Sequence, residues 1–155
     1  MTTNDHESVA RVARYAAHIT ALAAAFKVHL AVCATMRPDE AGAGINKADK
    51  DLPRERQRLM IKIYPVIDDT TYAVALHELG HCAHAVGSLI MESSIKMRLT
   101  NRVSTLRDVR LQLDGENAAW EWAHHYALEW TASMTAIETF SRESYLLRAR
   151  QLGVK

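Results

Sequence analysis

Cysteine is scarce in this 155-residue chain, which contains only Cys33 and Cys82. The two form neither a CxxC pair nor a disulfide framework, which is typical of a protein of the reducing cytosol. The N-terminus also lacks the basic segment followed by an apolar segment that marks a secretory signal. The alanine-rich stretch 16–34 is interrupted by two histidines and a lysine, so it is not expected to span a membrane. These absences predict a cytoplasmic protein without a membrane partner.

An excess of charge of one sign is missing as well. The chain has 19 lysines and arginines against 18 acidic residues, a formal net charge of +1, which argues against a surface built for nucleic acid. The basic residues of segment 96–110 are spread among apolar residues and interrupted by Asp108, which favours a solvated face. No internal repeat or low-complexity linker divides the chain. Its length therefore predicts one domain, residues 1–155, with its own core.

The most informative segment is 77–81, which reads HELGH and is a form of the HExxH motif. On a helix, residues four apart share a face and lie about 6 Å apart along the axis. His77 and His81 can therefore bind one zinc ion from the same side. Glu78 lies roughly 100° around the helix from His77. That is the position needed for a general base acting on a zinc-bound water.

The sequence around this motif predicts a buried helix. Helix-capping side chains occur in segment 67–71, residues 71–86 are almost all compatible with a helix, and Gly87 is a natural end. One narrow strip of mostly small residues suits close packing by a neighbouring element: Leu76, Gly80, Ala83 and Gly87. Polar groups on a buried helix need partners. The alternative to a metal site is a set of core histidines and a glutamate satisfied by hydrogen bonds.

A zinc site needs a third protein ligand, and the nearest candidates do not suit it. His84 faces the same way as His77 and His81, but it lies about 10 Å along the axis from His77. A straight helix cannot bring all three imidazoles onto one ion. Cys82 points away from the ligand face and is expected to be a small buried hydrophobe.

Glu116 is the better third ligand. In a helical projection it falls in the middle of an apolar face that also carries Trp120, Ala123, Ala127 and Trp130. Glu121 falls on the opposite side, where a solvated glutamate belongs. A carboxylate within an apolar face is costly unless it is paired or bound to a metal. The alternative is that Glu116 lies in the first helical turn and only complements the helix dipole.

The order of these motifs resembles a known family. HELGH followed by Glu116-x-x-Ala119-Trp120-x-Trp122-Ala123 resembles the gluzincin pattern HExxH…ExxANxFA of small bacterial and phage metallopeptidase-like proteins of the ImmA/IrrE type. The resemblance covers about residues 57–130. It implies that His77, His81 and Glu116 bind Zn²⁺ and that Glu78 is the catalytic base. The chain departs from the pattern where tryptophan replaces its asparagine, at position 120, and its phenylalanine, at position 122.

The resemblance also implies a fold and a setting. We expect an α+β, mainly helical, zincin-like minimal metallopeptidase domain with a small sheet next to the HExxH helix. In zincin-type folds an edge strand just before that helix binds extended peptide by strand addition, and Leu59–Ile63 would take that part here. The partner would be a peptide or protein substrate in the cytosol of a bacterium or a phage-infected host.

The remaining segments complete the predicted architecture. A stripe at alternating four- and three-residue steps predicts an N-terminal helix in residues 1–36: Val12, Ala16, Ile19, Ala23, Phe26, Leu30 and Cys33. Arg37-Pro38 would end that helix, and residues 39–51 would be a loop. Gln57–Tyr64 is predicted to be a strand stopped by Pro65, at the start of the metal-site core 57–130.

The C-terminal part is predicted to be a last helix, residues 131–150. Thr131 would be its N-cap, and one side would carry Met134, Ile137, Ser141 and Tyr145.

These patterns together predict a zinc metallopeptidase. Glu78 would accept a proton from the zinc-bound water and pass it to the leaving amine. Candidate donors to the oxyanion are Tyr64, His84 and His124. Two alternatives remain: a non-catalytic zinc-binding interaction module, structural or regulatory, on the same scaffold, and a zinc-free helical regulatory or DNA-binding protein.

Overall fold

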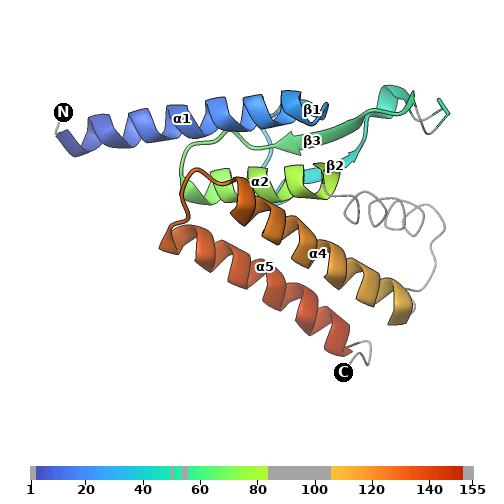
Figure 1. Ribbon diagram of the computed structural model, residues 1–155. Coiled ribbons are helices and arrows are strands. Elements are labelled where there is room, and N and C mark those ends of the chain that lie inside the picture. Colours follow the sequence, from blue (N-terminus) through green and yellow to red (C-terminus); the bar gives the residue numbers. More distant parts are fainter. Residues whose placement is uncertain (1–2, 50, 54–55, 84–105, 152–155) are drawn as a thin grey trace.

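A mainly helical α+β arrangement is seen in the computed structural model, which describes residues 3–49, 51–53, 56–83 and 106–151 (Figure 1). The described helices are α1 (Thr3–Ala25), α2 (Asp69–Ala83), α4 (Leu106–Tyr126) and α5 (Ala132–Gln151). The strands are β1 (His29–Val32), β2 (Gly42–Ile45) and β3 (Leu59–Ile63), with short 3₁₀ turns at Pro38–Glu40 and Lys47–Asp49. This arrangement confirms the predicted fold class as a mainly helical α+β fold with a small sheet.

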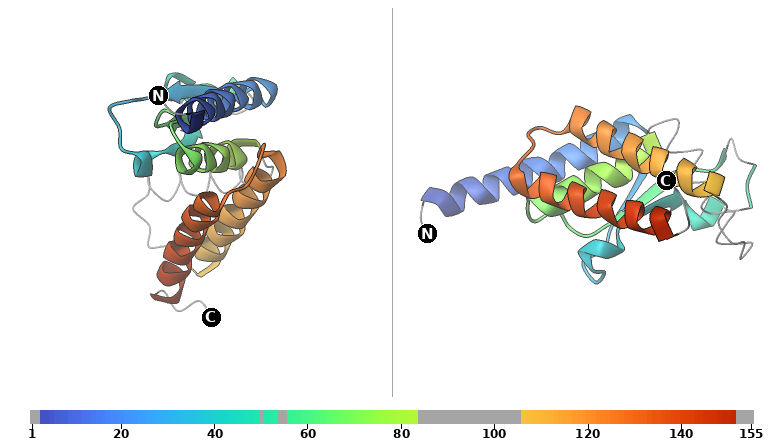
Figure 2. Two further views of the ribbon diagram at one scale, coloured as in Figure 1. Left: turned by 90° about the vertical axis from the view of Figure 1, so that its left-hand side faces the viewer. Right: turned by 90° about the horizontal axis from the view of Figure 1, so that it is seen from below.

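Helix α2 occupies the middle of the molecule. It contacts α1, β2 and β3 as well as α4 and α5. Figures 1 and 2 show α1 and the sheet on one side of α2 and the α4–α5 pair on the other. Its buried residues therefore belong to both layers, which explains why the sequence of α2 is apolar nearly all round. Among the described residues, no helix is long and apolar enough to cross a membrane.

The sheet has the strand order β1-β3-β2. Strand β1 runs parallel to β3, with Leu30 opposite Ile61, and β2 runs antiparallel to β3, with Ala43 opposite Ile61. The predicted strand is therefore central, and the expectation that Leu59–Ile63 is a peptide-binding edge strand is wrong. Both edges of β3 are occupied because the segment 39–51, expected to be a loop, contains β2, and because β1 replaces the end of the expected N-terminal helix.

Helix α1 ends eleven residues earlier than the predicted 1–36 helix, at Ala25. Lys27 adopts a left-handed conformation with φ 56°. The amide of Val28 donates to the carbonyl of Ala23 at 2.8 Å, and that of Lys27 donates to Ala24 at 3.1 Å. These two bonds are the helix-ending pattern known as a Schellman motif. The chain then enters β1, so the continued apolar spacing at positions 30 and 33 does not belong to a helix.

Helix α2 begins with a reciprocal cap. The amide of Thr71 donates to Asp68 Oδ1 at 2.7 Å, and the amide of Asp68 donates to Thr71 Oγ1 at 3.1 Å. Two amides that have no partner within the helix are thereby satisfied. This confirms the capping predicted for segment 67–71. The predicted end of the helix at Gly87 lies outside the described residues.

Helices α4 and α5 lie side by side (Figure 2). The predicted N-cap of the last helix is confirmed, because the amide of Met134 donates to Thr131 Oγ1 at 3.4 Å. Met134 is fully buried.

Candidate metal centre

Two helices bring the three predicted ligands together. His77 and His81 come from α2 and Glu116 from α4. The two Nε2 atoms lie 3.0 Å apart. Glu116 Oε2 is 3.1 Å from His77 Nε2, and Oε1 is 3.3 Å from His81 Nε2. These side chains form a group that can hold a metal ion.

The close approach of α2 to α4 depends on Gly80. A Cβ atom added to Gly80 would lie 2.6 Å from the carbonyl oxygen of Ala119. Glycine therefore allows the backbones to meet at this point. Because Gly80 lies directly before His81, and Ala119 lies one helical turn after Glu116, the crossing point sets the distance between the ligands. The predicted close packing of the small-residue strip is confirmed at Gly80, while its last member, Gly87, lies outside the described residues.

Glu116 lies well inside its helix, ten residues after Leu106. That position rules out the alternative in which it only complements the dipole in the first turn, since this effect is limited to the helix ends. Its residue exposure is 8%, whereas Glu121 is exposed. The prediction that the buried face carries Glu116 and not Glu121 is confirmed, but the helix ends at Tyr126, so Ala127 and Trp130 do not belong to that helical face.

The pKa values of Glu116 and His81 are both shifted by contacts within this group. Burial raises the pKa of Glu116, but short contacts with His77 and His81 outweigh burial and lower it to about 2. Burial lowers the pKa of His81, but contact with Glu116 and the negative charges of Glu78 and Glu116 outweigh it and raise that pKa. The group without metal therefore favours an ionised carboxylate beside a proton on His81, and a cation is suited to replace that proton.

The spacing of the three side chains suits a metal ion. One ligand atom from each of them lies within 4.8 Å of the other two. The two Nε2 atoms are 3.0 Å apart, near the roughly 3.3 Å that separates two ligands of a tetrahedral zinc, while Glu116 meets His77 through Oε2 and His81 through Oε1. Hydrogen bonding within the described residues leaves the group incomplete, because His77 Nδ1 and Glu116 Oε2 are both buried without an aligned partner there. Of these two atoms, Glu116 Oε2 faces the group and is available to a metal ion.

Glu78 is not one of the three proposed ligands, but its charge affects the pKa of His81. Its side chain is partly exposed, and its negative charge contributes to the raised pKa of His81. A carboxylate placed beside the ligands and open to solvent can accept a proton from water.

The other sequence candidates are placed as follows. Cys82 is 5% exposed, and burial is the main reason that its pKa is raised to about 12; it is the buried thiol that was predicted. His124 Nε2 lies 2.6 Å from Glu138 Oε2, so this oxyanion candidate already has a carboxylate partner. Tyr64 is partly buried. His84 lies outside the described residues.

Sequence reasoning missed the role of Trp120, which it treated only as a departure from a motif. Its indole stacks on the imidazole of His77. Trp120 follows Glu116 by four residues and so lies on the same face of α4. That spacing was the available signal, but the stacking partner comes from another helix.

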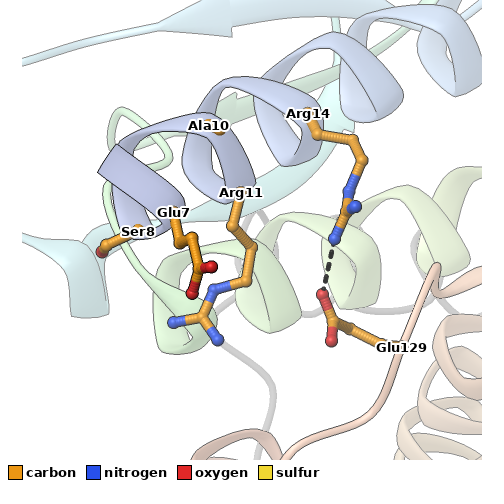
Figure 3. A pocket seen from close by; sticks show the side chains of 6 residues that line it. All are labelled: Glu7, Ser8, Ala10, Arg11, Arg14 and Glu129. Carbon is orange, nitrogen blue, oxygen red and sulfur yellow. Dashed lines mark hydrogen bonds and ion pairs between the residues drawn. The ribbon is translucent and has the colours of Figure 1, made fainter. Parts of the chain in front are cut away.

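A separate surface groove lies over α1 (Figure 3). Figure 3 shows Arg14 reaching across to Glu129, which follows α4, and the two side chains are 2.9 Å apart. Tyr15 also donates to Glu129 at 2.9 Å. None of the ligand side chains lines this groove. Its contacts attach α1 to the segment between α4 and α5.

Comparison with protein-family models, curated proteins and solved structures finds no match to this chain. The indication of function therefore comes from the side chains of the site.

Proposed function

We propose that this chain is a zinc metallopeptidase of the gluzincin type, similar to ImmA/IrrE proteins, with His77, His81 and Glu116 as zinc ligands and Glu78 as general base. The observation that carries the proposal is the convergence of a buried glutamate from α4 onto the two histidines of an HExxH helix. Two imidazoles and one carboxylate are a common donor set of catalytic zinc, and three protein ligands leave a fourth position open.

Each side chain has a separate task in this proposal. A bound zinc ion supplies Lewis acidity, which makes water a better proton donor and polarises a substrate carbonyl. His77 and His81 bind in their neutral forms, and Glu116 brings one negative charge to the site. Glu78 accepts a proton from the attacking water and gives it to the amine that leaves when the peptide bond breaks.

The proposed substrate is an extended peptide or an unfolded protein segment. Since β3 is central, the edge that lies against α2 is that of β2. Within the described residues β2 pairs with β3 alone. Such an edge suits strand addition by a peptide. We place the reaction in the cytoplasm because Cys33 and Cys82 are free thiols.

A second candidate is a non-catalytic zinc-binding module. It is favoured by the origin of the ligands, because a metal held by α2 and α4 would join two helices whatever chemistry follows. This candidate gives Glu78 no task, so the two functions differ in what a substitution at Glu78 does.

The test compares Glu78→Gln with the unaltered protein and with Glu121→Gln, which changes an exposed glutamate of α4. Hydrolysis of a mixture of unstructured peptides is followed by mass spectrometry, and bound zinc is measured in the same samples. We expect Glu78→Gln to keep its zinc and to lose activity by about 10²-fold or more, while Glu121→Gln retains both. Full activity of Glu78→Gln would refute the mechanism. Zinc binding without hydrolysis in all three proteins would favour the second candidate.

A further inference from the structure

The indole ring of Trp120 stacks on the imidazole of His77, one of the proposed ligands. The centroids of its ring and of the His77 ring are 4.2 Å apart, with an angle of 24° between the planes. Trp120 is 1% exposed, so its position is fixed by the core. Helix α4 thus supplies both the ligand Glu116 and the surface on which His77 rests.

Among the described residues, none provides the usual hydrogen bond that fixes a ligand imidazole at His77. A metal-binding histidine commonly donates its second ring N–H to a carboxylate, carbonyl or water, which sets the ring orientation. His77 Nδ1 is buried, and within the described residues it has no hydrogen-bond partner. The contact seen on the face of the ring is the stack with Trp120.

We propose that Trp120 is a positioning residue for His77, an inference that rests on the proposed zinc site. By stacking on the ring, the indole keeps Nε2 of His77 directed at His81 and Glu116. Its electron-rich face also favours the imidazole once coordination withdraws electron density from that ring, for the same reason that indole attracts cations. The stack therefore stabilises the metal-bound state more than the metal-free state.

Trp120 packs in turn against Trp130, which packs against His124. Trp130 meets Trp120 edge to face, with centroids 6.4 Å apart and planes at 87°. His124 stacks on Trp130 at 3.7 Å, and its Nε2 lies 2.6 Å from Glu138. The indole of Trp120 is therefore enclosed between the ligand and a packed pair of rings, and it cannot turn away without displacing them.

Three variants of the full chain test the proposal: Trp120→Leu, Trp120→Phe and, as a matched control, Trp122→Leu. Trp122 lies two residues further along α4 and is also buried, but its rings contact Tyr126 and Phe26. Zinc affinity is measured by competition with a chromophoric chelator. The visible absorption spectrum of bound Co²⁺ reports ligand geometry independently of activity and of stability.

We expect Trp120→Leu to weaken zinc binding by about 10- to 100-fold, the usual effect of losing a group that orients a ligand, and to change the Co²⁺ spectrum. Trp120→Phe keeps a smaller stacking face and should fall between Trp120→Leu and the unaltered protein. Trp122→Leu should lower stability but leave the zinc affinity and the Co²⁺ spectrum of the folded protein unchanged.

Unaltered zinc affinity and Co²⁺ spectrum in Trp120→Leu would overturn the positioning role while leaving the zinc site intact. If the Leu variant does not fold, Trp120→Phe decides, since wild-type affinity together with a wild-type spectrum in that variant would also overturn it. A wild-type chain that binds no zinc would overturn both the positioning role and the proposed function.

Discussion

Replacing Gly80 with alanine changes the point at which the two ligand-bearing helices touch. The new Cβ atom would lie 2.6 Å from the carbonyl oxygen of Ala119 and 3.0 Å from its Cα atom. Both of these are backbone atoms, so no side-chain rotation can relieve the clash. Either α4 moves away from α2, or both helices bend.

The size of the displacement follows from the contact distance. Restoring an ordinary separation of 3.4 Å requires α2 and α4 to move apart by about 0.8 Å at this point. Glu116 lies one turn from Ala119 and moves with it. Metal–ligand distances in a working site are held to about ±0.2 Å. A displacement several times larger should weaken zinc binding by about 10- to 100-fold, as other disturbances of ligand orientation do.

Stability should change less than zinc affinity. Forcing a methyl group into a packed contact costs about 1–3 kcal/mol, while replacing glycine with alanine inside a helix returns about 1 kcal/mol of propensity. We therefore expect the metal-free Gly80→Ala protein to lose about 0–2 kcal/mol of unfolding free energy. Urea unfolding of the metal-free protein measures this change, and a chelator competition measures the zinc affinity.

Gly42→Ala is the matched control, because a Cβ atom there would meet nothing within 4 Å. It should bind zinc like the unaltered protein. If Gly80→Ala binds zinc with unchanged affinity and is more stable by the full helix-propensity gain, the crossing of α2 and α4 at Gly80 does not set the ligand geometry, and this reasoning is refuted.

Two further predictions concern pH and the end of α1. Burial lowers the pKa of His81, but Glu116 and Glu78 raise it overall. The proton on His81 therefore stabilises the metal-free fold fully at pH values below the unfolded-state pKa of about 6.5. This stabilisation is lost as the pH rises through the higher pKa of the folded state. Because zinc must displace that proton, the zinc affinity should rise with pH between these two pKa values. Calorimetry should show proton release on zinc binding over the same pH range. A zinc affinity that does not change with pH would contradict His81 as a ligand. Lys27→Gly, at φ 56°, should raise the free energy of unfolding by about 0.5–1 kcal/mol in urea titrations; a loss of stability would show that the left-handed turn is not strained.

The local parts of the site could be predicted from the sequence because helix geometry fixes them. Residues four apart share a face, so His77 and His81 were certain to be neighbours once the segment was helical. Glu116 was predictable for a different reason: a carboxylate within an apolar face requires a partner. The structure supplies that partner from α2. The cap formed by Asp68 and Thr71 is equally local.

Non-local features were not predictable in the same way. The apolar spacing of the N-terminal segment continues past Ala25, but a left-handed lysine ends the helix. Strand β2 is short and contains two glycines, so only its pairing with β3 identifies it. The stack of Trp120 on His77 joins two helices. For β2 and Trp120 the decisive contact comes from a distant part of the chain, which a periodic pattern does not report. The end of α1 is local, but it depends on the conformation of Lys27 and not on apolar spacing.

The zinc content of the chain tests the central claim most directly. Native mass spectrometry of protein purified without added chelator should find one zinc ion per chain. Glu116→Gln should lose most of this zinc, because a neutral amide replaces the charged ligand, whereas Glu121→Gln should keep it. One tightly bound zinc that depends on Glu116 is the predicted result. A chain that takes up no zinc, even when zinc is added back, would contradict the account.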